Sequence, residues 1–433
     1  MLTTKYLRDN LDAIKKSLEQ RKSAYPLDKL LEMDKGMRSA KSELQAMQER
    51  MNKASLEISA AKKAGKEIGA MVESLGSLKK EICAIEAKLP ALQIEIDKLL
   101  WNMPNVLEGS VPYGKSEDDN VVTRTWGKVV KKQTPGHAET LIKLGLLDIE
   151  QAATVSGARF YYLKGDLALL EQSLIRFGID EIVKKGYTLV SPPLMLKKEY
   201  YKGVTALGDF EDALYKVSDS NEAKGVEGYE KMDDEMFLIS TSEHALAALH
   251  AGQVLRGKDL PLKYVGVSPC FRREAGSHGK DTKGIFRVHH FYKIEQYIFC
   301  KPEDSGRYFD ELLANVEEIY QKLQMPYHIL NFCTGGIGTV AAKKNDVEVY
   351  MQGQAAYREV ASCSNCTDWQ SVRLDIKYDE GGERRYVHTL NSTAIPVERT
   401  LVAITENCVN DDGTITVPDA LVPYMGKSRI TGK

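Results

Sequence analysis

The sequence predicts an α+β protein in which an N-terminal antiparallel helical hairpin precedes a domain built on a mostly antiparallel sheet. Two tracts, 30–61 and 68–103, carry apolar residues at alternating spacings of three and four. A connector at 102–120 is rich in proline, glycine, serine and aspartate. Beyond it, short apolar stretches are separated by local turns, which is the pattern of antiparallel strands.

The length and composition indicate a multidomain enzyme without a membrane-spanning part. A chain of 433 residues is too long for one compact core. Charged residues make up 28%, and the seven cysteines follow no regular framework, which suggests reduced thiols. No apolar run approaches about 18 residues, and the N-terminus lacks the pattern of a signal peptide. We therefore expect a cytoplasmic protein with no membrane partner, in which any RNA contact depends on local basic patches because the net charge is only −2.

The two apolar tracts predict a coiled-coil arm over about 29–103. A sustained repeat of 3.5 residues is typical of a coiled-coil seam. The break at Ala64-Gly65-Lys66 predicts a tight turn, so the tip of the arm is expected near 63–67. Each helix is then about 50 Å long at 1.5 Å per residue. On periodicity alone, a coiled coil that serves oligomerisation remains an alternative.

The connector separates a predicted N-terminal domain, 1–108, from a second domain, 109–433. In the second domain, Asp166 is expected to cap a helix, and a strand at Tyr187–Val190 ends at Pro192-Pro193. Taken alone, this segment is better explained as an ordinary part of a core. Further strands are predicted at Arg159–Lys164, Met236–Ile239, Tyr264–Val267, Phe286–Phe291, Ile294–Cys300, Val347–Met351, Tyr357–Ala361 and Tyr386–Leu390.

The stretch from Cys270 to Glu295 combines side chains that suit a nucleotide and an amino-group substrate. Arg272 and Glu274 precede a polar turn rich in glycine, lysine and serine, and Arg287, Phe291 and Glu295 follow it on extended chain. Guanidinium groups bind phosphate, an aromatic ring can stack on a base, and a carboxylate can bind an amine. The sequence contains no phosphate-binding glycine loop, and Gly335-Gly336-Ile337-Gly338 is interpreted as a turn.

Two further motifs place oxygen groups near the ends of predicted strands. Thr241-Ser242-Glu243 can bind an ammonium group, although a helix N-cap before His244 explains the same residues. Glu359 and Ser362 offer hard oxygen ligands of the kind that Mg²⁺ prefers. Cys363 and Cys366 form one CxxC pair, but no second pair with suitable spacing follows, so we expect no zinc.

Together these motifs resemble those of class II aminoacyl-tRNA synthetases, and their flanking residues resemble seryl-tRNA synthetases in particular. The resemblance is to the common type, not to the methanogen-specific zinc type. It covers nearly the whole chain, and the phrases LLWNMPNV and CSNCTDWQSVR look similar to archaeal and eukaryotic cytosolic forms. It places motif 1 at about 170–195, motif 2 at about 264–298 and motif 3 at about 386–407.

The resemblance implies a set of site residues. Arg272 and Arg399 are the implied catalytic residues, and Glu359 and Ser362 the implied Mg²⁺ ligands. The implied serine-binding residues are Thr241, Ser242, Glu243, Arg272, Glu295, Asn391 and Thr393. The implied ATP-binding residues are Arg272, Arg273, Glu274, Arg287, Val288, Phe291, Glu359, Val360, Ala361, Ser362 and Arg399.

The same resemblance implies a reaction and its partners. Serine and ATP form seryl-adenylate and pyrophosphate, and the seryl group passes to tRNA(Ser), with tRNA(Sec) left open as a second acceptor. Arg272 bridges the α-phosphate and the serine carboxylate, Glu274 contacts the adenine side, and Arg287 contacts the γ-phosphate. Arg399 also faces the γ-phosphate and sandwiches the adenine opposite Phe291. The helical arm grips the tRNA, and motif 1 forms a homodimer.

Two residues depart from the family pattern. Gly336 stands where an acid is common, and Glu398 precedes the motif 3 arginine where a small residue is more usual. Two other classes of protein remain as alternatives. One is an RNA-binding paralogue that has lost the chemistry, and the other is a coiled-coil scaffold with a nucleotide-sensing domain.

Overall fold

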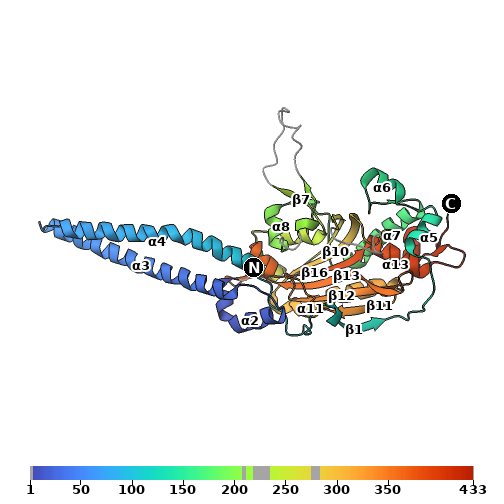
Figure 1. The fold of residues 1–433 in the computed structure, drawn as a ribbon, viewed down its shortest axis with the longest axis horizontal. Helices are drawn as coiled ribbons and strands as arrows, with labels where there is room; N and C mark the ends of the chain where they lie inside the picture. The colour runs from blue at the N-terminus through green and yellow to red at the C-terminus, as the bar shows by residue number, and fades with distance from the viewer. Residues whose placement is uncertain (1–2, 207–210, 218–234, 275–282, 433) are drawn as a thin grey trace, which may run out of the picture. The chain divides into compact units, whose positions relative to one another are not determined.

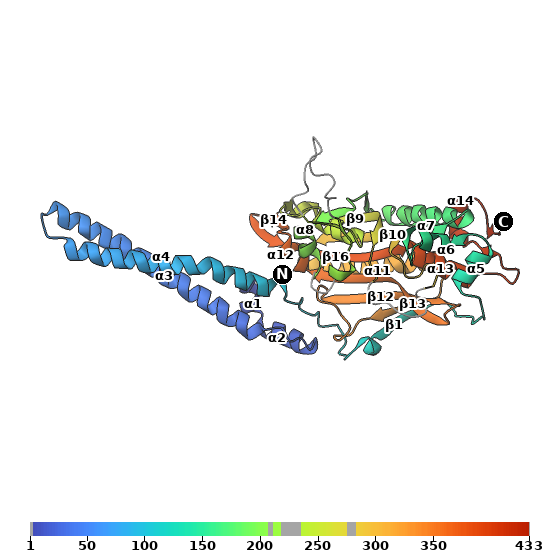
Figure 2. The same ribbon diagram turned by 45° about the horizontal axis from the view of Figure 1, so that its top comes forward.

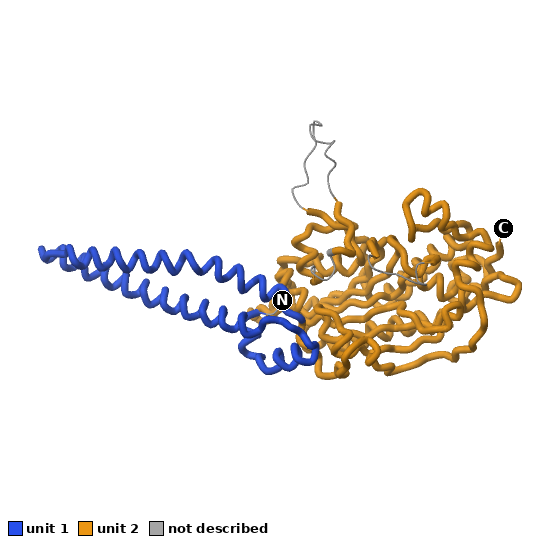
Figure 3. Tube along the Cα trace, viewed as in Figure 1, with its two compact units in different colours: residues 1–104 blue, residues 105–433 orange. Residues whose placement is uncertain are grey.

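The structure is a computed structural model that describes residues 3–206, 211–217, 235–274 and 283–432. The polar turn predicted within motif 2 falls largely on 275–282, outside the described residues. The chain divides into two compact units, Met1–Pro104 and Asn105–Lys433 (Figure 3). This division lies a few residues before the predicted boundary. None of the described helices is long and apolar enough to cross a membrane.

Unit 1 is entirely helical and contains the predicted hairpin (Figures 1 and 2). Its helices are α1 (Thr4–Asp9), α2 (Leu11–Gln20), α3 (Leu27–Lys63) and α4 (Gly69–Trp101). Helices α3 and α4 run antiparallel and are joined by a short turn in which Gly65 has a φ of 67°. That left-handed conformation favours glycine, which has no Cβ to clash. The predicted helical hairpin is therefore confirmed.

The base of the hairpin is better buried than its tip. Leu30, Met37 and Ile96 are buried there, whereas the seam residues Met51 and Ile58 nearer the tip are only partly buried. Asp34 is also buried at the base, where its carboxylate accepts hydrogen bonds from Arg8 at 2.8 Å and Arg38 at 3.1 Å. The thin seam towards the tip leaves little apolar area to hold the two helices together, so the base supplies most of their packing.

Unit 2 is a mixed helix and sheet domain. Its helices are α5 (His137–Lys143), α6 (Glu150–Ser156), α7 (Asp166–Val183), α8 (Lys198–Val204), α10 (Ser242–Ala248), α11 (Ser305–Lys322), α12 (Trp369–Arg373), α13 (Val397–Cys408) and α14 (Val422–Met425). Its longer strands are β1 (Val121–Trp126), β9 (Leu262–Phe271), β10 (His290–Cys300), β11 (Tyr327–Asn331), β12 (Lys343–Met351), β13 (Ala356–Thr367) and β16 (His388–Pro396). The shorter strands are β2 (Leu147–Asp148), β3 (Tyr162–Leu163), β4 (Thr188–Val190), β5 (Met195–Lys197), β6 (Lys216–Val217), β7 (Met236–Leu238), β8 (Val254–Arg256), β14 (Lys377–Glu380), β15 (Glu383–Tyr386), β17 (Ile415–Thr416) and β18 (Arg429–Ile430).

An eight-stranded sheet dominates unit 2, in the order β1-β11-β12-β13-β16-β10-β9-β4. Every pair is antiparallel except β4 with β9, so the predicted, mostly antiparallel sheet is confirmed. Three local predictions were wrong. Asp166 is the first residue of α7 and not its N-cap, which is Gly165. The strand predicted at Tyr386–Leu390 is divided between the end of β15 and the start of β16. Residues 286–289 precede β10 instead of forming a strand, and the two strands predicted on either side of Phe291 belong to one strand, β10.

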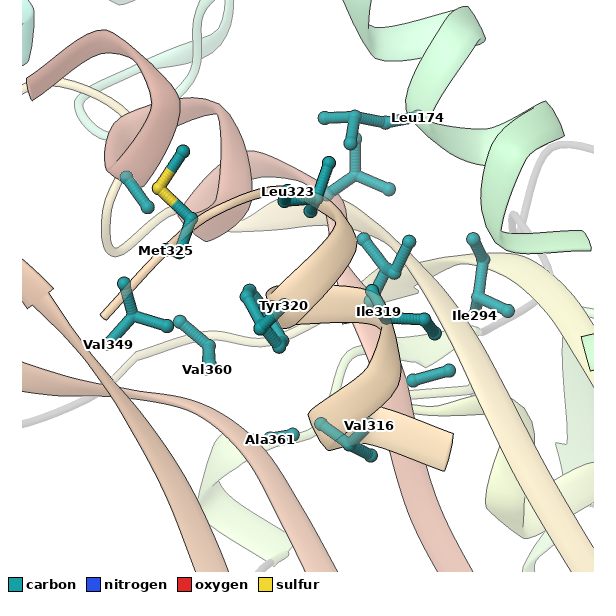
Figure 4. Packing of buried hydrophobic residues seen from close by; sticks show 14 of the residues in the cluster. Leu174, Ile294, Val316, Ile319, Tyr320, Leu323, Met325, Val349, Val360 and Ala361 are labelled. Atoms are coloured by element: carbon teal, nitrogen blue, oxygen red, sulfur yellow. The ribbon is translucent and has the colours of Figure 1, made fainter. Parts of the chain in front are cut away.

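Helices α7 and α11 hold the central strands in place through a continuous apolar core. Figure 4 shows Val316, Ile319 and Tyr320 of α11 among side chains of the sheet and of α7. Gly178 lets α7 approach β10 closely, because a Cβ there would lie 2.4 Å from the Ile294 side chain. Ile294 points into this core, so the alternation of a strand directs its neighbours Lys293 and Glu295 to the opposite face. That opposite face carries the cavity described next.

Candidate active site

A cavity of about 340 Å³ lies over the middle of the eight-stranded sheet. Strands β10, β13 and β16 supply its floor, and the start of α10, the residues flanking the motif 2 turn and the start of α13 supply its walls. Most of the predicted site residues line it: Thr241, Glu243, Arg272, Glu274, Arg287, Val288, Phe291, Glu295, Glu359, Val360, Ser362, Asn391, Thr393 and Arg399. Motifs 2 and 3 therefore meet the motifs at 241–243 and 359–362 at one cavity of the size typical for small-molecule sites.

Three predicted residues do not line this cavity. Ser242 is fully buried, and its hydroxyl is 2.7 Å from that of Ser268. Arg273 is exposed, and its backbone N–H donates to the carbonyl of Ala213 at 2.9 Å. Ala361 points to the other face of β13 and packs in the apolar core (Figure 4). Each is a sequence neighbour of a lining residue, which is why a motif match includes it.

A bulge in β13 explains how both predicted metal ligands reach the cavity. Residues three apart on a regular strand face opposite sides of a sheet. The register between β12 and β13 shifts, so that Val347 pairs with Ala361 while Glu348 pairs with Glu359. Val360 is the extra residue, and it changes the phase of the alternation by one. Glu359 and Ser362 consequently face the same side.

One end of the cavity is acidic and buried. Thr241 is the N-cap of α10, and its Oγ1 accepts from the Glu243 N–H at 3.2 Å. Thr241 therefore caps α10 and also lines the cavity, so the N-cap interpretation and the binding interpretation of this motif are compatible. The Glu243 carboxylate accepts from the amides of Gln370 at 3.0 Å and Asn391 at 3.1 Å. Burial, together with the nearby Glu295 carboxylate, raises the pKa of Glu243 to about 7.

Lys293 is a functional candidate that the motif analysis missed. Its Nζ lies 2.5 Å from Glu295 Oε2, and both side chains are less than 10% exposed. The Thr393 hydroxyl donates to the same carboxylate oxygen at 3.2 Å. Strand alternation could have found Lys293, because Phe291, Lys293 and Glu295 are two residues apart and share a face.

The other end of the cavity is rich in guanidinium groups and aromatic rings. The Arg272 guanidinium carbon lies 5.0 Å from the centre of the Phe291 ring, and its Nε donates to the Ser240 carbonyl at 3.3 Å. Arg287 Nη1 is 3.6 Å from the Glu274 carboxylate. Arg287 Nε is buried and meets no acceptor among the residues that the structure describes. An unsatisfied buried donor in a cavity wall is a favourable position for an anionic ligand.

Arg399 occupies the start of α13. Its Nη1 donates to the Glu359 carbonyl at 3.0 Å and lies 3.4 Å from the Glu359 carboxylate. Burial would raise the pKa of Glu359, but Arg399 and other nearby cations outweigh it and lower the pKa. The aromatic ring next to the Arg399 guanidinium is Phe286, at 4.9 Å. Phe286 is a second lining residue that the motif analysis missed.

Ser362 is oriented by a buried acid. Its hydroxyl donates to Asp346, a residue of β12 that is 3% exposed. Burial raises the pKa of Asp346 to about 7, against the opposing effect of Lys344 at 3.5 Å. The two cysteines that follow serve separate contacts, because Cys363 lies beside the Phe309 carbonyl and Cys366 beside the Asn391 amide.

The antiparallel sheet, with arginines from two separate motifs facing one cavity, defines the catalytic core of a class II aminoacyl-tRNA synthetase. Comparison with known families agrees, because the class II core domain for Gly, His, Pro, Ser and Thr matches residues 215–408. The seryl-tRNA synthetase N-terminal domain matches residues 1–107.

Full-length relatives identify the branch. The serine–tRNA ligase of Methanocella arvoryzae is 44% identical, over 98% of this chain and 99% of that protein. A crystal structure of seryl-tRNA synthetase from Pyrococcus horikoshii complexed with ATP matches with a TM-score of 0.93, 40% identity and full coverage of both chains. The cytoplasmic serine–tRNA ligase of Naegleria fowleri in complex with AMP matches with a TM-score of 0.87 and 34% identity, over 98% and 96% of the two chains. The chain belongs to the serine–tRNA ligases, so it is a ligase that joins serine to tRNA.

Proposed function

We propose that the cavity holds serine at its acidic end and ATP at its arginine-rich end, and that their reaction takes place between the two. The single observation that carries this proposal is that buried carboxylates and arginines from motifs 2 and 3 line one cavity. Glu243 and Glu295 lie together with Lys293, whereas Arg287 and Arg399 are grouped with Glu274 and Glu359. Relatives with the same fold are complexed with ATP or AMP, which supports a nucleotide at the arginine-rich end.

At the acidic end, charge balance favours an ammonium-bearing substrate. Two carboxylates, Glu243 and Glu295, face one lysine ammonium, Lys293, so one more positive charge neutralises the group. The serine ammonium is assigned to Thr241 and Glu243, and the serine hydroxyl to Glu295 and Thr393. Alanine lacks that hydroxyl and leaves buried polar groups without a partner, and sites of this kind reject such analogues by about 10⁴-fold or more.

At the arginine-rich end, we assign each residue the role that the family resemblance implies, and the lining of the cavity supports these assignments. Phe291 stacks on the adenine, and Glu274 and the backbone of Val288 lie beside it. The buried Nε–H of Arg287, which meets no acceptor within the described part of the chain, is proposed to bind a terminal phosphate. Arg399 reaches the phosphates from α13 and, by its planar guanidinium, covers the adenine face opposite Phe291. Arg272 lies against Phe291 near the boundary between the two ends and bridges the α-phosphate and the serine carboxylate.

The reaction then needs orientation and charge stabilisation, with no covalent enzyme intermediate. A carboxylate oxygen of serine attacks the α-phosphorus, the bond to the β-phosphate oxygen breaks, and pyrophosphate leaves. Arg272 and Arg399 stabilise the negative charge that develops on the phosphoryl oxygens. In the second step the terminal ribose hydroxyl of the tRNA attacks the seryl carbonyl, and AMP leaves with the bonding electrons. Holding both reactants in line supplies a large share of the rate.

A magnesium ion bound with ATP fits the residues present. Within the described residues no three histidine, cysteine or acidic side chains gather as a metal site. Magnesium needs no such cluster, because it is commonly held by one or two protein oxygens together with phosphates and water. Glu359 and Ser362 are the proposed ligands, and the hydrogen bond to Asp346 turns the Ser362 lone pairs away from that acid. When bound, the ion neutralises phosphate charge.

The remaining partners are proposed from surface features. Lys62, Lys63 and Lys66 give the tip of the arm a local positive charge suited to an RNA backbone, here that of tRNA(Ser). The arm offers no reason to exclude tRNA(Sec). Exposed apolar side chains on α7 and β4, including Leu169 and Leu189, are suited to the homodimer contact expected of motif 1. We place this protein in the cytoplasm, where its substrates occur.

The assignment is tested by amino-acid-dependent exchange of pyrophosphate into ATP, screened over the twenty amino acids. We expect exchange with serine, and loss of about 10²-fold or more in Arg272→Ala, because a charged group that stabilises the transition state is removed. Arg273→Ala is the matched control, since this adjacent arginine is exposed and does not line the cavity. Near-normal exchange in Arg272→Ala, or an equal loss in Arg273→Ala, contradicts the site assignment.

A further inference from the structure

Glu398, the residue before the motif 3 arginine, is a buried acid to which the proposed mechanism gives no role. It lies in the first turn of α13, is 2% exposed and touches the wall of the cavity. Family resemblance predicts a small residue at this position. A carboxylate in such a place is costly unless its oxygens are hydrogen-bonded, so its partners indicate what it does.

The Glu398 carboxylate continues the β-ladder where strand β16 ends. Strand β10 pairs with β16 up to Lys293 opposite Pro396, the last residue of β16. Proline has no N–H and the chain turns into α13 there, so the next residue of β10, Tyr292, has no strand opposite it on that side. The Tyr292 N–H donates instead to both carboxylate oxygens of Glu398, at 3.1 and 2.9 Å.

A third segment joins the same carboxylate. The Tyr161 hydroxyl donates to Glu398 Oε1 at 2.5 Å. The Tyr161 ring is buried and stacks on His290 at 5.0 Å, with the planes 6° apart. Burial raises the pKa of Glu398 to about 8, and the Glu171 carboxylate raises it further, while the bonds from Tyr161 and Tyr292 lower it. Glu398 therefore ties together α13, β10 and the segment that precedes β3.

The sequence positions of these partners connect Glu398 to the nucleotide. Phe291 immediately precedes Tyr292, and Arg399 immediately follows Glu398. We propose that Glu398 is a positioning residue that fixes the separation of Phe291 on β10 and Arg399 on α13, and so sets the width of the slot that receives the adenine ring. This inference rests on the proposed function, because it takes these two side chains as the faces of the nucleotide site.

The proposal predicts that loss of Glu398 affects the binding of ATP and the binding of serine differently. Without the carboxylate, the start of α13 loses its link to β10 at the position next to Phe291. The acidic end of the cavity is anchored elsewhere, through Thr393 to Glu295 and through Asn391 and Gln370 to Glu243. Removal of Glu398 therefore weakens the binding of ATP and spares that of serine.

The test measures the Kd for ATP by isothermal titration calorimetry and the KM for serine by exchange. In Glu398→Ala we expect the Kd for ATP to rise about tenfold, equal to about 1.4 kcal/mol, and the KM for serine to stay within twofold. Glu398→Gln keeps the side chain's shape and an acceptor oxygen, so it should restore the Kd to within about threefold. Tyr161→Phe, which removes one bond with little change of volume, should raise the Kd by a smaller factor.

Glu406→Gln is the matched control on the same helix. Glu406 is also buried and accepts from the Gly353 N–H at 3.0 Å and from His137, away from the slot. An unchanged Kd for ATP in this control supports the proposal. Equal rises in the ATP and serine constants of Glu398→Ala, a rise of similar size in Glu406→Gln, or failure of Glu398→Gln to restore binding overturns it. A wild-type protein that binds ATP but exchanges with another amino acid contradicts the proposed function alone, whereas one that does not bind ATP contradicts both.

Discussion

Serine binding should depend on pH through Glu243. Its carboxylate lies at the acidic end of the cavity, and burial and Glu295 raise its pKa to about 7. Only the ionised form attracts the serine ammonium fully. With a pKa of 7, about one tenth of the carboxyl groups are ionised at pH 6 and about nine tenths at pH 8. We therefore expect the KM for serine to be about tenfold higher at pH 6 than at pH 8.

The assay is serine-dependent pyrophosphate exchange at saturating ATP over this pH range. Glu243→Gln is the decisive variant, because it keeps the size of the side chain and removes its titration. It should bind serine weakly at every pH and lose the pH dependence. Two other buried acids have raised pKa values, Asp346 at about 7 and Glu398 at about 8. A KM for serine that is flat in the wild type, or a slope that persists in Glu243→Gln, refutes the reasoning.

The raised pKa of Glu243 also affects folding stability, which should fall as the pH rises, whereas serine binding should improve. A carboxyl group whose pKa is raised in the folded state holds its proton more tightly there than in the unfolded chain. Between the unfolded value of about 4.5 and the folded value of about 7, the folded state binds more protons, so the contribution of Glu243 to stability falls as the pH rises. Added serine should reverse part of this loss, because its ammonium stabilises the ionised form.

Two further predictions concern the ion pair in the cavity and the arm. Lys293→Met leaves the buried Glu295 without its ammonium and should lower the free energy of unfolding, measured in urea, by at most about 3–5 kcal/mol. Lys301→Met is the control, because its 2.5 Å pair with Glu380 is much more open to solvent and should contribute far less to stability. Equal effects of the two substitutions contradict the prediction. Gln48 lies 3.3 Å from Glu86 across the arm, so positions 45 and 89 lie opposite each other on the two helices. Replacing 45–89 by a short glycine linker should leave pyrophosphate exchange within twofold and abolish most tRNA charging. Unchanged charging contradicts the proposed role of the arm in binding tRNA.

Sequence periodicity was enough to predict the hairpin and the sheet, because both depend on local spacing. Gly65 and the phase of the two apolar tracts were enough to predict the tip of the hairpin. Short strands with local turns were enough to predict the antiparallel sheet, which is confirmed. The residues at which strands begin were harder to predict from the sequence. Residues 286–289 have strand-like composition but lie before β10, since pairing with β9 starts only at His290.

The cavity could be predicted only as a set of motifs. Which members of a motif face the ligand depends on strand phase, and a bulge changes that phase without a clear signal in sequence. Val360 is the extra residue of the bulge in β13. Because of this bulge, Glu359 and Ser362 both face the cavity, while Ala361 packs in the apolar core. Lys293 was missed for a different reason. Its alternation with Phe291 and Glu295 is visible in the sequence, but only the structure shows that it forms an ion pair within the cavity.

In the proposed site, the arrangement of charge favours one orientation of serine and ATP. An ammonium group is attracted to Glu243 and Glu295 and repelled by Arg287 and Arg399, while a triphosphate has the opposite preference. In the proposed site the serine carboxylate, only two bonds from its ammonium, is assigned to Arg272. The same arginine lies against Phe291, and the proposed site assigns the α-phosphate to it as well. Attack at the α-phosphorus, in preference to the β- or γ-phosphorus, follows from that assignment.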